Sequence, residues 1–241
     1  MSARALLVRG LAAGLVAGLV TFVVAYVVGG PQVEAAISLE ETGGGGDVSR
    51  ALQRTWGLLT ATVTVGLALG GAVALVVAGT LGRLGRLLPG QSTALVTLLG
   101  FVSFALVPFL KYPANPPAVG DGATIGHRTA LYFGFVLVSV VAAVLATRGA
   151  LRVRERVGTY GGVVAGVTGY LLVVVLAGQV LTPAAGVGDF PADTLWSFRL
   201  ASLVTLATLW GVIGLVLTGL VSRLYADATA QDVRRDTAAS L

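Results

Sequence analysis

Six long runs of apolar residues alternate with short polar breaks along the chain. Each run is close to the roughly 20 residues that a helix needs to cross the hydrocarbon core of a bilayer. We therefore predict transmembrane helices at about residues 3–29, 54–82, 92–110, 127–147, 160–181 and 195–224. The pattern predicts an all-α, polytopic membrane protein in which residues 1–241 form a single transmembrane domain made of a bundle of six helices.

The composition agrees with a lipid environment. Hydrophobic residues make up 56% of the chain and charged residues only 11%, whereas roughly 25% of the residues in a soluble domain are charged. The net charge is +5, but the arginines stand at the ends of apolar runs and form no patch interleaved with aromatic residues. These positions indicate how the chain is oriented in the membrane, and they argue against a nucleic-acid partner.

The distribution of positive charge predicts the orientation. Eleven of the 16 lysines and arginines fall at the N-terminus, in the turns after the second and fourth helices, and in the C-terminal tail. Positively charged residues favour the cytoplasmic side, so we expect a cell-membrane protein with both termini in the cytoplasm. Most of the acidic residues then face outward, in loops between helices.

Glycines recur at every fourth residue in two of the predicted helices: Gly10, Gly14 and Gly18 in the first, and Gly158, Gly162 and Gly166 at and after the start of the fifth. This spacing places bare backbone along one helix face, where a neighbouring helix can approach closely. We also expect Pro31 to end the first helix, a short interfacial helix to follow it, and Pro108 to bend the third helix in its last turn.

The three outward hairpins share an order that suggests a repeat. In each, a proline ends a helix, an acidic loop follows, and an arginine opens the next helix. The prolines are Pro31, Pro113 and Pro183. The acid–arginine pairs are Asp47 with Arg54, Asp121 with Arg128, and Asp193 with Arg199. Our hypothesis is three similar hairpins around a central axis. Generic capping explains the same residues, because proline stops helices and charged residues cap them in most membrane proteins.

The most distinctive stretch covers residues 111–133, between the third and fourth helices. It contains the only lysine, the only histidine, three of the eight prolines and an aspartate between two glycines. Closely spaced prolines make the backbone rigid, so the loop is expected to have a defined shape. The alternative is a surface turn that only reverses the chain.

Carboxylates and one imidazole are predicted to gather on the outward face. Without a thiolate, such a set suits a hard or borderline divalent ion, and cobalt, nickel, manganese and magnesium all fit it. The predicted metal ligands are Glu40, Glu41, Asp121, His127, Asp189 and Asp193. Residues expected to shape or gate the entrance are Lys111, Asn115, Arg54, Arg128 and Arg199.

Two of these residues have a second interpretation. His127 opens a helix beside Arg128, where the helix dipole favours a neutral ring that is available as a ligand, but a histidine at this place is also typical of an amphipathic cap. Arg199 lies within the first turns of the last helix and is expected to pair with Asp193, Asp189 or another loop acid. It is equally well explained as a solvated arginine that reaches the membrane surface.

Sequence motifs of enzymes are not found. The chain lacks a His-x-x-x-His or Glu-x-x-His spacing, a phosphate-binding Gly-Lys motif and paired carboxylates at mid-membrane depth. It also contains no cysteine, which excludes disulfides, thiolate metal sites and thiol nucleophiles. We predict that the protein is not an enzyme and carries no permanently bound cofactor.

Four stretches resemble the CbtA family of probable cobalt transporter subunits, and the resemblance extends over essentially the whole chain. They are residues 111–121 (Lys-Tyr-Pro-Ala-Asn-Pro-Pro-Ala-Val-Gly-Asp), 125–132 (Ile-Gly-His-Arg-Thr-Ala-Leu-Tyr), 36–41 (Ala-Ile-Ser-Leu-Glu-Glu) and 190–200 (Phe-Pro-Ala-Asp-Thr-Leu-Trp-Ser-Phe-Arg-Leu). The resemblance implies a membrane component of a cobalt uptake system that serves cobalamin synthesis. It also implies a small partner, CbtB, with one spanning helix and an end that bears histidines.

The leading hypothesis is therefore a Co²⁺ permease subunit in the lipid bilayer, with Co²⁺ as its substrate. The alternative is a membrane scaffold that transports nothing and holds another membrane protein through its glycine faces. The near absence of ionisable residues at mid-bilayer depth favours that alternative, because ion pathways usually contain some. The sequence leaves open whether the chain forms a homo-oligomer.

Overall fold

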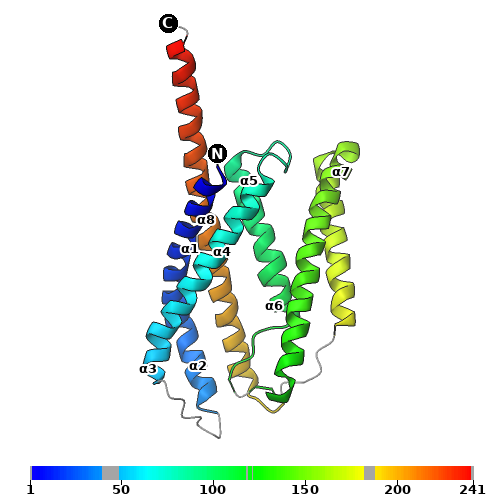
Figure 1. Ribbon diagram of the computed structural model, residues 1–241. Helices are drawn as coiled ribbons and strands as arrows, with labels where there is room; N and C mark the ends of the chain where they lie inside the picture. The colour runs from blue at the N-terminus through cyan, green and yellow to red at the C-terminus, as the bar shows by residue number, and fades with distance from the viewer. Residues whose placement is uncertain (1, 40–48, 118, 121, 182–187, 240–241) are drawn as a thin grey trace. The chain divides into compact units, whose positions relative to one another are not determined.

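The computed structural model describes all residues except 1, 40–48, 118, 121, 182–187 and 240–241 (Figure 1). In the described part every regular element is a helix, as the hydrophobic pattern predicts. Among the described residues, five helices are long and apolar enough to cross a membrane: Ala3–Ile37, Arg50–Thr80, Pro89–Lys111, Gly122–Val180 and Ala192–Ala239. The prediction of an all-α protein with several helices that could span a membrane is thus confirmed, whereas the bundle of six helices stays a prediction.

The predicted fourth and fifth helices belong to one continuous element, α7 (Ile125–Val180). Gly158 interrupts it with non-helical angles, φ 79° and ψ 175°. A positive φ costs little only in glycine, so the chain can turn here without leaving its helices for more than one residue. The predicted basic loop at residues 148–156 is therefore wrong. Its Leu, Arg and Glu residues are good helix formers and simply extend the first arm of α7.

The two arms of α7, residues 125–157 and 159–180, pack antiparallel against each other (Figure 1). A Cβ atom on Gly162 would lie 2.6 Å from the carbonyl oxygen of Ala150, and one on Gly166 would lie 2.8 Å from Cβ of Ala150. The close approach predicted for these two glycines is confirmed. Gly158 makes no such contact, because it forms the turn instead.

A small core joins the two arms at a distance from the turn at Gly158. Phe135 and Ala142 of the first arm pack with Tyr170 and Val174 of the second. Ser139 is fully buried, and its hydroxyl lies 2.8 Å from that of Tyr170. This hydrogen bond satisfies two polar groups where water is excluded.

The chain divides into two compact units: residues 1–24, 50–98 and 207–241 form the first, and residues 25–49 and 99–206 the second. The first unit is centred on the packing of α1 (Ala3–Val24) against α4 (Leu58–Thr80). A Cβ on Gly70 would lie 2.8 Å from Cα of Gly14, and a Cβ on Gly18 would lie 2.7 Å from Cα of Val63. The glycine face predicted for the first helix is confirmed.

Small and hydroxyl side chains also join α5 (Pro89–Gly100) to α8 (Ala192–Ala239) within the first unit. A Cβ on Gly90 would lie 3.4 Å from Cβ of Ser222, and one on Gly214 would lie 3.1 Å from Cγ2 of Thr97. Thr93 and Thr97 are buried, and each donates its hydroxyl to the carbonyl four residues earlier. The hydroxyls of Thr93 and Thr97 are therefore buried without being left unpaired.

Two prolines enter helices after π-helical segments. Pro31 lies at the start of α2 (Gly30–Ile37), after the π segment η1 (Ala25–Gly29), and Pro108 lies at the start of α6 (Val107–Lys111), after η3 (Phe101–Leu106). In a π segment each carbonyl pairs five residues on, and proline is tolerated in the first turn of the helix that follows. The prediction that Pro31 ends the first helix is thus wrong, and the expected interfacial helix continues from it as α2.

Several other helix ends also lie outside their predicted positions. The second spanning helix begins at α3 (Arg50–Leu52), passes the π segment η2 (Gln53–Gly57) and continues as α4. The tail beyond residue 224, which lies outside the predicted sixth helix, is part of α8, which ends at Ala239. The threefold repeat stays a hypothesis, because Pro183 lies outside the described residues and Pro31 has no helix end beside it.

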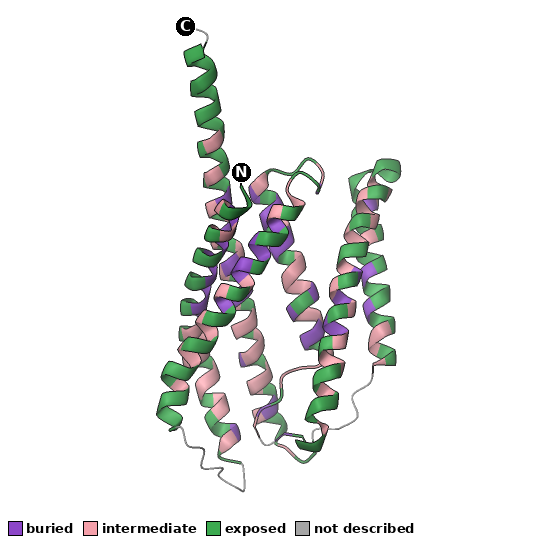
Figure 2. Cartoon of the chain, in the orientation of Figure 1, coloured by how far each residue is buried: buried purple, intermediate pink, exposed green. Residues whose placement is uncertain are grey.

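Much of the apolar surface of these helices is exposed in the isolated chain (Figure 2). On the second arm of α7, for example, Val163, Val167 and Leu171 are each about half exposed. A soluble protein rarely tolerates such continuous apolar faces. They fit helices whose outer surfaces contact lipid.

Candidate functional site

The loop that follows α6 is held against both arms of α7. The ring of Tyr112 packs edge-on against Phe135 of the first arm, with centroids 5.8 Å apart and an interplanar angle of 82°. Its hydroxyl donates a hydrogen bond to the carbonyl of Leu181, which caps the second arm. Tyr112 therefore ties the start of the loop to the hairpin at two points.

The environment of Tyr112 keeps its hydroxyl protonated. Burial raises the pKa of Tyr112 above its ordinary value of 10.0, because desolvation disfavours the phenolate. The neutral hydroxyl is the form that donates to Leu181. Lys111 completes the contact, with its Nζ 5.7 Å from the centroid of the Tyr112 ring.

Arg199 of α8 holds the middle of the loop. Its Nη2 donates to Oδ1 of Asn115 over 3.1 Å. The pairing predicted with Asp193 or Asp189 is wrong, since both of these side chains are exposed and the hydrogen bond of Arg199 goes to an amide. The loop's fold brings Asn115 to the arginine, a contact between residues far apart in sequence that charge patterning does not reveal.

Arg128, in the first turn of α7, holds the end of the loop. A Cβ on Gly120 would lie 2.9 Å from Cζ of Arg128, so the guanidinium rests directly on the glycine backbone. Gly120 has φ 95°, a conformation that residues with a Cβ rarely adopt. Between the two arginine contacts the chain makes a turn in which the Val119 amide bonds the Pro116 carbonyl over 3.3 Å.

The structure therefore brings four of the predicted shaping residues to one loop: Lys111, Asn115, Arg128 and Arg199. Arg54, the fifth, lies half-buried in the π segment η2 of the first unit. Tyr112 and Gly120 were not among the predicted site residues. The available signals were a tyrosine between a helix-end lysine and a proline, and a Gly-Asp-Gly sequence, both of which also occur in ordinary turns.

Only three of the six predicted metal ligands lie among the described residues. His127 is exposed in the first turn of α7, Asp193 is exposed in the first turn of α8, and Asp189 is exposed just before it. Glu40, Glu41 and Asp121 lie outside the described residues. Within the described ranges no three His, Cys, Asp or Glu side chains come together as a metal site. The ligand set stays a prediction.

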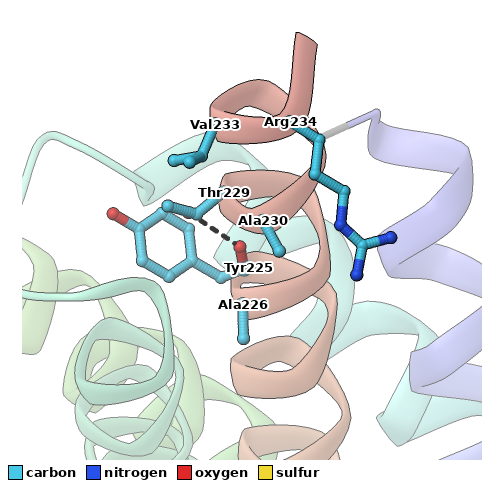
Figure 3. A pocket seen from close by; sticks show the side chains of 6 residues that line it. All are labelled: Tyr225, Ala226, Thr229, Ala230, Val233 and Arg234. Atoms are coloured by element: carbon cyan, nitrogen blue, oxygen red, sulfur yellow. Dashed lines mark hydrogen bonds between the residues drawn. The ribbon is translucent and has the colours of Figure 1, made fainter. Parts of the chain in front are cut away.

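A surface depression on α8 lies apart from this loop in sequence. Figure 3 shows its lining, which comes from one face of a single helix: Tyr225, Ala226, Thr229, Ala230, Val233 and Arg234. The hydroxyl of Thr229 donates to the carbonyl of Tyr225 within the same helix over 3.0 Å. A groove lined by one helix surrounds a ligand too little to hold it, so we assign no function to it.

Comparison with known proteins gives one match. The family model for CbtA, described as a probable cobalt transporter subunit, matches residues 3–222. The match reaches into all five long apolar helices and includes the loop held by Tyr112, Arg128 and Arg199. No curated protein and no solved structure matches the chain.

Proposed function

We propose, since the chain belongs to the CbtA family of probable cobalt transporter subunits, that it is the membrane subunit of a cobalt uptake system that supplies cobalamin synthesis. The family match over residues 3–222 is the observation that carries the proposal. A transporter family is not an enzyme family, and the match gives no support to the scaffold alternative. Five long apolar helices fit a protein that resides in the membrane.

The proposed topology has six crossings. Each arm of α7 is long enough to span about 30 Å of hydrocarbon, because an α-helix rises about 1.5 Å per residue. A turn at Gly158 then lies on the same side as the termini, and Arg148, Arg152, Arg154 and Arg156 next to it favour the cytoplasm. Both termini are proposed to be cytoplasmic.

In this topology the loop between α6 and α7 lies on the outer face. We propose that Co²⁺ reaches the membrane here through oxygen and imidazole ligands drawn from Glu40, Glu41, Asp121, His127, Asp189 and Asp193. The predicted topology supports the proposal, because it places these residues on one face of the membrane. Co²⁺ is the cargo of the protein.

The word subunit in the family description implies a partner. We propose a small CbtB-type protein with one spanning helix. The glycine faces are one means by which such a helix can approach closely. Transport is then expected to need both chains, or to increase strongly when both are present.

The test is cobalt uptake into proteoliposomes that contain the chain, with and without the small partner. Replacing Glu41, Asp121 and His127 together by Gln, Asn and Gln is expected to reduce uptake at least tenfold, because each lost ligand weakens the ion site. A matched control replaces the tail acids Asp227, Asp232 and Asp236 by Asn, and is expected to transport normally. Normal transport by the first variant would contradict the proposed ligands, while absence of uptake by the unaltered pair would contradict the function itself.

A further inference from the structure

Two arginines in the second unit hold one short turn and have no acidic partner among the described residues. Arg199 binds the side-chain oxygen of Asn115, and Arg128 lies on the backbone of Gly120. Asn115 and Gly120 are five residues apart, so at most about 17 Å of extended chain separates them. The turn between Pro116 and Val119 brings the two contacts closer than that.

The charge of these arginines is not neutralised by the described carboxylates. Asp189 and Asp193 are exposed near the start of α8, and neither pairs with Arg199. Nε of Arg199 is buried and finds no hydrogen-bond acceptor within the described part of the chain. That atom is out of reach of a ligand, but Nη2 of Arg199, whose hydrogen bond to Asn115 lies at an exposed position, keeps a second N–H for an anion. A guanidinium matches the oxygen atoms of a phosphate particularly well.

The aromatic residues around the turn indicate its depth. Trp196 stands one helical turn before Arg199 and is 64% exposed. Lys111 ends the apolar helix Pro89–Lys111 that leads into the turn. Exposed tryptophan beside lysine and arginine at the end of an apolar helix is typical of the zone where phospholipid headgroups lie.

We propose that Arg128 and Arg199 form a binding site for the phosphate of an anionic phospholipid. The lipid would supply the negative charge that the described residues lack, and it would hold the turn between Asn115 and Gly120 at the membrane surface. Each arginine is expected to raise the relative affinity for an anionic over a zwitterionic lipid by about fivefold. This site goes beyond the proposed transport function and does not depend on cobalt.

The experiment uses Trp196 as its reporter. The full chain carries Trp56→Phe and Trp210→Phe, so that Trp196 is the single tryptophan, and is reconstituted in phosphatidylcholine with brominated phosphatidylglycerol or brominated phosphatidylcholine. Bromine on the acyl chains quenches a tryptophan only at short range. We expect brominated phosphatidylglycerol to quench Trp196 at much lower mole fraction, with a preference of about 25-fold from two arginines.

Variants assign the preference to the proposed residues. Arg128→Gln with Arg199→Gln is expected to abolish it, whereas Arg234→Gln with Arg235→Gln, which removes the same charge from the tail, is expected to keep it. Should the glutamine pair fail to fold by circular dichroism, the pair Arg128→Lys and Arg199→Lys, together with Arg199→Gln alone, replaces it. The lysine pair is expected to keep most of the preference, and the single variant to lose about fivefold.

Three results would overturn the proposal: equal quenching by the two lipids in the parent, an unchanged preference in the glutamine variants, or an equal loss in the tail control. Suppression of the preference by inorganic phosphate would assign the site to a soluble phosphate and would refute the lipid as its ligand. Cobalt transport is measured separately, so the lipid site and the transport function can fail independently.

Discussion

The packing of α1 on α4 predicts a strong difference between two glycine-to-alanine substitutions. In Gly14→Ala the new Cβ would lie 2.7 Å from the carbonyl carbon of Gly66 and 3.0 Å from Cα of Leu67. These are backbone atoms and cannot rotate away, so the two helices must separate. Gly79→Ala in α4 is the matched control, because a Cβ there meets nothing within 4 Å.

Both substitutions gain about 1 kcal/mol of helix propensity, so this term cancels in the comparison. Forcing extra volume into a packed interface costs about 1–3 kcal/mol. Gly14→Ala is therefore expected to be less stable than Gly79→Ala by about 1–3 kcal/mol. Equilibrium unfolding in mixed micelles with increasing SDS measures the difference. Equal stability of the two variants would refute the close backbone contact between α1 and α4.

Three further predictions concern the second unit. Gly120→Ala is expected to destabilise the protein by about 1–2 kcal/mol relative to Gly122→Ala, because Gly120 has φ 95° and Arg128 occupies the space that a Cβ would need. Equal unfolding midpoints of the two variants would argue against this contact. A double-mutant cycle of Ser139→Ala and Tyr170→Phe is expected to give a coupling of about 0.5–1.5 kcal/mol for their 2.8 Å hydrogen bond, and zero coupling would mean that the hydroxyls do not interact. Burial raises the pKa of Tyr112 and so favours its neutral form in the fold. The stability that the neutral hydroxyl contributes is present below pH 10 and is lost as the pH rises through the folded-state pKa. If the Tyr112→Phe variant loses as much stability at alkaline pH as the parent does, the prediction is contradicted.

The sequence predicts where the chain crosses the membrane better than it predicts where helices end. Apolar runs and the spacing of Gly10, Gly14 and Gly18 are local patterns, and the structure bears them out. A charged residue marks the edge of the hydrocarbon, but arginine and glutamate continue a helix readily in water. For this reason the first arm of α7 and the tail of α8 extend beyond their predicted ends.

The prolines and the candidate site are likewise predicted only in part, because they depend on more than local sequence patterns. Pro31 and Pro108 follow π segments, which depend on hydrogen bonding that the sequence pattern does not show. Lys111, Asn115, Arg128 and Arg199 lie at one loop, and their role at the entrance stays a prediction. Their partners could not be predicted, since Asn115 reaches Arg199 only after three elements have packed around the loop.

The central claim is that this chain mediates cobalt entry. The most direct measurement is the accumulation of radioactive cobalt by cells that lack their own cobalt uptake and express the chain together with its small partner. Cells with both chains are expected to take up far more cobalt than cells with an empty vector, and to lose this uptake when the chain is omitted. Equal cobalt content in cells with and without the chain, despite its presence in the membrane, would contradict the account.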